Sequence, residues 1–76
     1  MDNRIRTERA ERGWTQAGLA EQLDVSRQTV VALETGKYDP SLPLAFRIAS
    51  LFGKSIEELF FPTGAVRETG RLSELP

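Results

Sequence analysis

The feature that most constrains this chain is a helical spacing of apolar residues that is interrupted at short intervals. Three glycines suit the residues that end helices, at Gly13, Gly36 and Gly53. Short hydroxyl side chains stand where the next helices should begin, at Thr15, Ser26, Ser41 and Ser55. Helices shorter than about 12 residues rarely persist alone in water. These segments must therefore fold together as one compact bundle.

The predicted helices cover about residues 2–12, 16–23, 27–35, 42–52 and 56–60. Ile5 and Ala10 are the expected inward positions of the first. In the last, Ser55 and Glu58 have the spacing of a capping box. Alternating apolar and polar residues are absent before residue 60, so no sheet core is expected. The predicted fold class is all-α, a bundle of five helices.

Length and composition narrow the possible functions. The chain has 76 residues, enough for one small domain, with no cysteine and no histidine. Zinc sites built from thiolates or imidazoles, cysteine nucleophiles and histidine-based triads are therefore excluded. We expect no enzyme, no cofactor and no metal. No segment approaches the roughly 20 apolar residues of a membrane span, and the charged N-terminus lacks a signal-peptide core, so a cytoplasmic protein is expected.

The most informative segment runs from Gln16 to Lys37. It predicts two short helices joined by a turn of about three residues, with Ala20 where the helices must approach closely. Apolar contacts fix the crossing angle, and the second helix presents polar residues away from them. This is the helix-turn-helix arrangement, in which the second helix enters the major groove of DNA.

On these residues the chain resembles the Cro and lambda-repressor type of regulators, the XRE family. The resemblance covers about residues 3–61 and includes TQxxLA from Thr15, VSRQTV from Val25, LExGKYDPSL from Leu33 and IEELF from Ile56. It implies a lambda-repressor-like DNA-binding domain over residues 1–61, followed by an irregular C-terminal tail, 62–76, that is mobile or associated with a dimer.

The resemblance also implies roles for single residues. Arg27 and Gln28 match readers of base edges, and this agrees with their chemistry, since Arg pairs with guanine and Gln with adenine. Ala32 is a candidate for contact with a thymine methyl group. The positions expected to touch the DNA backbone are Gln16, Ser26, Thr29, Lys37 and Tyr38. Arg9 and Glu34 match a salt bridge between the first and third helices.

Three residues depart from the family pattern. Asp24 stands where a turn glycine is common, but aspartate tolerates the left-handed region. Gly18 lies inside the second predicted helix and should cost about 1 kcal/mol relative to alanine. Val31 replaces a residue that is often polar. It either meets a base methyl group or is merely exposed.

The weak net charge of −1 predicts weak binding by a monomer, because phosphate contacts supply most non-specific affinity. We therefore expect a homodimer on an inverted-repeat operator of double-stranded DNA, acting as a repressor. An apolar cluster is expected to form the dimer interface, at Ile56, Leu59, Phe60 and Phe61. Apolar residues of the tail, Val66, Leu72 and Leu75, would extend it.

Other interpretations remain open. Activation through a surface patch is possible, as in restriction–modification controller proteins. A protein-interaction module is the rival class, such as an antitoxin whose tail folds onto a toxin partner. At single residues, Tyr38 is as easily a loop-packing side chain as a phosphate contact, and Trp14 belongs to the core. Arg12, with two other arginines of the first helix, belongs mostly to a solvated face with local pairing.

Overall fold

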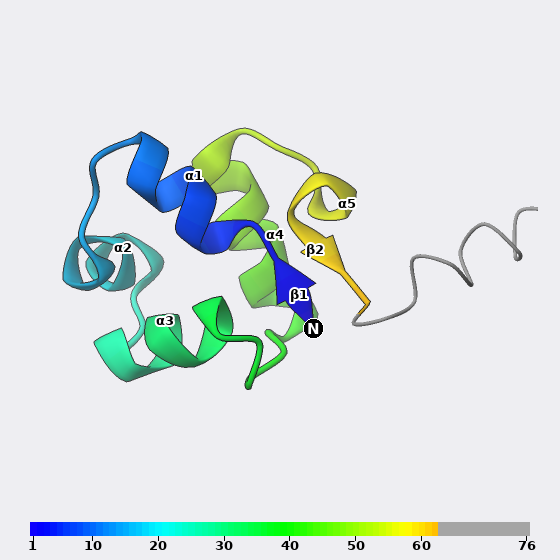
Figure 1. The fold of residues 1–76 in the computed structure, drawn as a ribbon, viewed down its shortest axis with the longest axis horizontal. Helices are drawn as coiled ribbons and strands as arrows, with labels where there is room; N and C mark the ends of the chain where they lie inside the picture. The colour runs from blue at the N-terminus through cyan, green and yellow to red at the C-terminus, as the bar shows by residue number, and fades with distance from the viewer. Residues whose placement is uncertain (63–76) are drawn as a thin grey trace, which may run out of the picture.

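The computed structural model describes residues 1–62. Five helices pack with a pair of two-residue strands, and α4 passes through the middle of the molecule, with α2 on one side and α5 on the other (Figure 1). The elements in chain order are β1 (Asp2–Asn3), α1 (Ile5–Glu11), α2 (Gln16–Leu23), α3 (Arg27–Glu34), α4 (Leu42–Phe52), α5 (Ile56–Leu59) and β2 (Phe60–Phe61). The all-α prediction is confirmed in its main features.

Each predicted hydroxyl cap begins a helix. The Thr15 side chain accepts a hydrogen bond from the backbone N–H of Gly18 at 2.9 Å, and equivalent bonds begin α3, α4 and α5. At α5 the capping box is complete, because the Ser55 N–H also donates to Glu58 Oε1 at 2.8 Å. Such caps satisfy N–H groups that have no partner within the helix.

The turn between α2 and α3 depends on one left-handed residue. Asp24 has φ 59° and ψ 46°, and its N–H bonds back to the carbonyls of Ala20 and Glu21. Asp24 is the only non-glycine residue with positive φ in the part of the chain that the structure describes. The predicted tolerance of this turn for aspartate is thus confirmed.

All five helices and β2 contribute buried apolar side chains to the core. Its largest fully buried side chains are Ile5, Leu19, Leu23, Val30, Leu33, Ile48 and Leu59. Trp14 packs against this core, as predicted, and its ring stacks on Phe52 with 5.8 Å between centroids. No helix within residues 1–62 is long and apolar enough to cross a membrane.

The first helix differs from its prediction. It begins at Ile5, because residues 2–3 form β1, which pairs antiparallel with β2 in the register Asp2–Phe61 and Asn3–Phe60. Asn3 Nδ2 also donates to the carbonyl of Leu33 at 2.7 Å. These long-range bonds hold the segment extended, so the predicted start of the first helix near residue 2 was wrong.

The inward face of α1 also differs. Ala10 is exposed, whereas Glu8 is 3% exposed. Arg12 pairs with Glu8 Oε1 at 2.8 Å, donates to the Phe52 carbonyl at 2.9 Å and lies over the Trp14 and Phe52 rings. Arg12 therefore does more than the local pairing that was expected of it, since its charge permits Glu8 to be buried.

Candidate nucleic-acid interface

The α2–α3 pair has the geometry that its sequence predicts. Leu19, Ala20 and Leu23 of α2 are buried, and Val25 in the turn donates its N–H to the Ala20 carbonyl at 3.0 Å. On α3, Val30 and Leu33 are fully buried. The opposite face of α3 is therefore turned away from the core.

That outward face carries the predicted base readers. Arg27 and Gln28 are both exposed in the first turn of α3. Val31 follows on the same side and is 36% exposed, whereas Ala32 is half-buried. A guanidinium, an amide and an isopropyl group thus project from one helix face.

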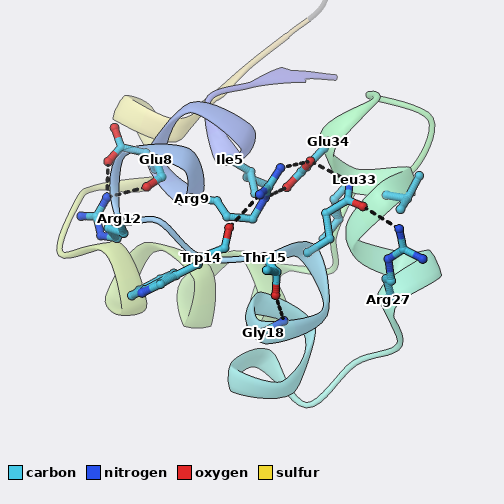
Figure 2. Close-up of polar contacts among 12 residues, drawn as sticks. Ile5, Glu8, Arg9, Arg12, Trp14, Thr15, Gly18, Arg27, Leu33 and Glu34 are labelled. Atoms are coloured by element: carbon cyan, nitrogen blue, oxygen red, sulfur yellow. Dashed lines mark hydrogen bonds and ion pairs between the residues drawn. The ribbon is translucent and has the colours of Figure 1, made fainter.

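A chain of hydrogen bonds links this face to the interior. Arg27 Nη2 donates to Gln16 Oε1 at 3.3 Å, and Gln16 Nε2 donates to Glu34 Oε1 at 3.2 Å. Glu34 accepts from Arg9 Nε at 2.6 Å, and Arg9 Nη1 donates to the Trp14 carbonyl at 2.8 Å (Figure 2). The ion pair that the resemblance implied is present. The hydrogen bond from Arg9 to Glu34 raises the pKa of the Arg9 guanidinium.

The sequence did not predict the place of Gln16 in this series of hydrogen bonds. The sequence assigned it to a DNA phosphate, but its amide also bridges α2 to α3. An amide group has two N–H donors, and Glu34 uses one of them. No sequence signal identified this bridge, because it depends on how the two helices cross.

The hydroxyl groups of α3 are engaged with their own helix. Ser26 Oγ accepts from the Thr29 N–H at 3.1 Å and lies 2.9 Å from Thr29 Oγ1. Thr35 Oγ1 donates to the carbonyls of Val31 and Ala32 at 3.0 and 3.2 Å. Lys37 and Tyr38, in the loop after α3, are both exposed, and Tyr38 is 44% exposed. The backbone-contact candidates thus lie in the α2–α3 region and the loop that follows it.

The predicted dimer cluster is mostly interior. Leu59 and Phe60 are 0% and 7% exposed, and Ile56 and Phe61 are half-buried. The expectation of an exposed cluster was wrong for Leu59 and Phe60, because α5 and β2 fold back against α4 and β1. Val66, Leu72 and Leu75, expected to extend the cluster, lie outside the described residues.

The most exposed apolar side chains lie elsewhere, on α4. Leu42 is 64% and Phe46 is 58% exposed, one helical turn apart. Leu42 and Ala45 border a groove of about 400 Å³, which Ile56, Phe60 and Pro62 also line. Their positions just outside the buried stripe of α4 were a signal that sequence analysis could have used. Within residues 1–62 no three acidic side chains gather as metal ligands.

Comparison with known proteins agrees with this geometry. Residues 5–59 match the helix-turn-helix family. An uncharacterized HTH-type transcriptional regulator of Methanocaldococcus jannaschii is 55% identical over 60 residues, covering 79% of this chain and 91% of the relative. A second such regulator, from Archaeoglobus fulgidus, is 53% identical over 60 residues, covering 79% and 86%.

A solved structure adds the fold. The hypothetical transcription factor NHTF from Neisseria is similar with a TM-score of 0.68 and 28% identity, covering 91% of this chain and 74% of that one. Sequence, geometry and relatives therefore agree, and the chain belongs to the XRE-type helix-turn-helix family of DNA-binding transcriptional regulators.

Proposed function

We propose that this protein is a sequence-specific regulator that reads the major groove of double-stranded DNA with α3. The observation that carries the proposal is the exposure of Arg27 and Gln28 at the start of that helix. A guanidinium pairs bidentately with guanine O6 and N7, and an amide with adenine N6 and N7. The hydrogen bond from Arg27 to Gln16 holds the guanidinium beside α2.

The surrounding residues support the same use of this face. Lys37 and Tyr38 are exposed in the next loop and suit contacts with phosphates. The N-terminal end of α2 at Gln16 suits another phosphate. Ser26 caps α3 by accepting from the Thr29 N–H, which orients the first turn, and the half-buried Ala32 methyl group lies one turn beyond Gln28.

Selection of bound duplexes from a random pool tests this reading. We expect wild-type protein to select one motif, and Arg27→Ala and Gln28→Ala each to reduce discrimination at one base pair by about 1–3 kcal/mol. Arg6→Ala is the charge-matched control, because Arg6 is exposed on α1. Unchanged discrimination in both variants, with helical content intact by circular dichroism, rejects the assigned readers.

We further propose that the protein acts as a homodimer whose subunits meet at the α4 face of Leu42 and Phe46. Phe46 protrudes from α4 one turn after Leu42, which borders the apolar groove, so a protruding side chain and a groove on one face can be complementary across a two-fold axis. The charges at this face also favour pairing of two subunits, since the basic Arg47 flanks Phe46 and the acidic Glu57 lines the groove. Neither forms an ion pair with another residue between positions 1 and 62.

The position of this face is compatible with DNA binding. The start of α4 lies near β1 and β2, at the side of the molecule away from α2 (Figure 1). A subunit docked there leaves the first turn of α3 accessible. Two recognition helices about 34 Å apart would then read the two halves of an inverted repeat.

Sedimentation equilibrium tests the dimer. Phe46→Glu should give a monomer, Arg47→Glu should weaken association, and Arg47→Glu combined with Glu57→Arg should restore it. Tyr38→Ala, an exposed aromatic outside the groove, serves as the control. A wild-type monomer at high micromolar concentration, or a dimer unaffected by Phe46→Glu, contradicts the proposal.

Repression is the regulatory outcome that we propose. A dimer that occupies an operator within a promoter blocks access by polymerase without any further contact. A reporter gene placed behind the selected motif should fall in expression when the protein is present. It should recover with Arg27→Ala, and increased expression would indicate an activator instead.

A further inference from the structure

Val31 is an apolar side chain on the face of α3 that carries the proposed readers. It lies four residues after Arg27 and three after Gln28, so the three side chains share one side of the helix. Val30 and Leu33, which are fully buried, occupy the other side. A helix that approaches base edges with Arg27 and Gln28 therefore brings Val31 to the same groove.

We propose that Val31 is a specificity-determining residue that contacts the C5-methyl group of a pyrimidine. This inference rests on the proposed function and extends it to a third base pair. In the major groove, thymine presents this methyl group and cytosine does not, so an apolar side chain distinguishes the two. An isopropyl group has no hydrogen-bonding atom with which to recognise any other feature of a base edge.

The neighbouring side chains strengthen this assignment. The hydroxyl groups of Ser26, Thr29 and Thr35 all bond to their own helix or to each other. These hydroxyl groups are therefore weak competitors for contact with the base that Val31 faces. The side chain of Val31 is also stiff at χ1, because valine in a helix strongly prefers one rotamer. Its methyl groups are thus held in place before DNA binds.

Ala32 is the alternative apolar contact. It is half-buried and offers a single methyl group, whereas Val31 is exposed and offers two. Helix geometry places the two residues on opposite sides of Gln28. A methyl group recognised by one would therefore belong to a different base from a methyl group recognised by the other.

The test uses the full chain and the duplex motif selected from the random pool. Each thymine is replaced in turn by uracil, which lacks only the C5-methyl group, and affinity is measured by fluorescence anisotropy. Burial of one methyl-sized group contributes about 0.8 kcal/mol. We expect about a threefold to fivefold loss at one thymine per half-site.

Variants assign that loss to a residue. Val31→Ala should weaken binding to the thymine duplex and abolish most of the penalty for uracil, and Ala32→Ser should leave the penalty unchanged. Exchange of that T·A pair for C·G should weaken wild-type binding, and 5-methylcytosine should recover part of the loss. The 5-methylcytosine duplex distinguishes the contribution of the methyl group from that of thymine O4.

Three results would overturn the inference. The first is that replacement of thymine by uracil lowers affinity at no position. The second is that the loss of affinity with uracil persists in Val31→Ala, and the third is that this loss disappears in Ala32→Ser. In each case the selected motif and its dependence on Arg27 would still support the proposed function. Failure to select any motif would instead count against the proposed function itself.

Discussion

At the scale of single residues, Glu34 connects the interior to the surface that we propose faces DNA. Its side chain is 3% exposed and accepts from Arg9 and from Gln16, which in turn accepts from Arg27. The carboxylate, at the last residue of α3, therefore links α1, α2 and α3, and the bonds through Gln16 extend this link to Arg27 in the first turn of α3. The family resemblance predicted the ion pair between Arg9 and Glu34, but not the hydrogen bonds through Gln16.

Removal of Glu34 should expose how much the fold depends on this pair. We expect Glu34→Ala to lower the free energy of unfolding by about 3–5 kcal/mol, because it leaves the Arg9 charge largely buried without a partner. The double variant Arg9→Met with Glu34→Leu should recover much of that loss. Urea denaturation checks both, and a loss under 1 kcal/mol for Glu34→Ala would contradict the expectation.

At the scale of helices, local signals determine where four of the five described helices begin. Four hydroxyl caps accept from the third residue of their helices, at Gly18, Thr29, Leu44 and Glu58. Three of these positions carry a side chain, and only α2 has glycine. The cap geometry therefore tolerates a Cβ atom at this position.

Gly18→Ala should for that reason stabilise the protein. A Cβ at position 18 would lie 3.2 Å from Thr15 Oγ1, so a small shift of the cap is required. Alanine is favoured over glycine in helices by about 1 kcal/mol, and we expect a net gain of a few tenths to about 1 kcal/mol. Thermal unfolding by circular dichroism measures it. A decrease in melting temperature would mean that the cap cannot shift.

The capping box of α5 should contribute a weak acid dependence. Hydrogen bonds from the Ser55 backbone and side chain lower the pKa of Glu58. A lowered pKa in the folded state means that the carboxylate stabilises the fold above its ordinary pKa, and that this contribution is lost as pH falls through the lowered value. The side chain is exposed, so solvent screens the effect.

Comparison of wild type with Glu58→Gln isolates this contribution. We expect the stability difference between the two to be present at neutral pH and to shrink progressively on acidification. Chemical denaturation at a series of pH values measures the difference. A difference that is constant down to strongly acidic pH would show that the carboxylate charge has no part in the cap.

At the scale of the whole molecule, the small net charge of −1 limits how DNA can be bound. Near α3, Arg27 and Lys37 are the described cations assigned to DNA, and Arg27 is assigned to a base. Few phosphates are then neutralised by each subunit. In the dimer that we propose, affinity should come from base contacts and from the pairing of two subunits rather than from a broad basic surface.

The salt dependence of operator binding should accordingly be shallow. Lys37→Ala should lower the magnitude of the slope of log K against log salt by about 1 per subunit and leave base preference unchanged. Arg6→Ala on α1 serves as the matched control and should leave the slope unaltered. Titrations between low and physiological salt measure the slopes. Loss of base preference in Lys37→Ala would mean that this residue reads bases.

The sequence by itself determined the bounds of α2 and α4, the starts of α3 and α5, the left-handed turn at Asp24 and the outward position of Arg27 and Gln28. These depend on caps, glycines and helical period, which act between neighbours in the chain. Only the tertiary structure decided that Asn3 joins a strand, that Glu8 is buried, and that Leu59 and Phe60 are interior. The physical reason is that these outcomes depend on partners far away in sequence, which no local pattern specifies.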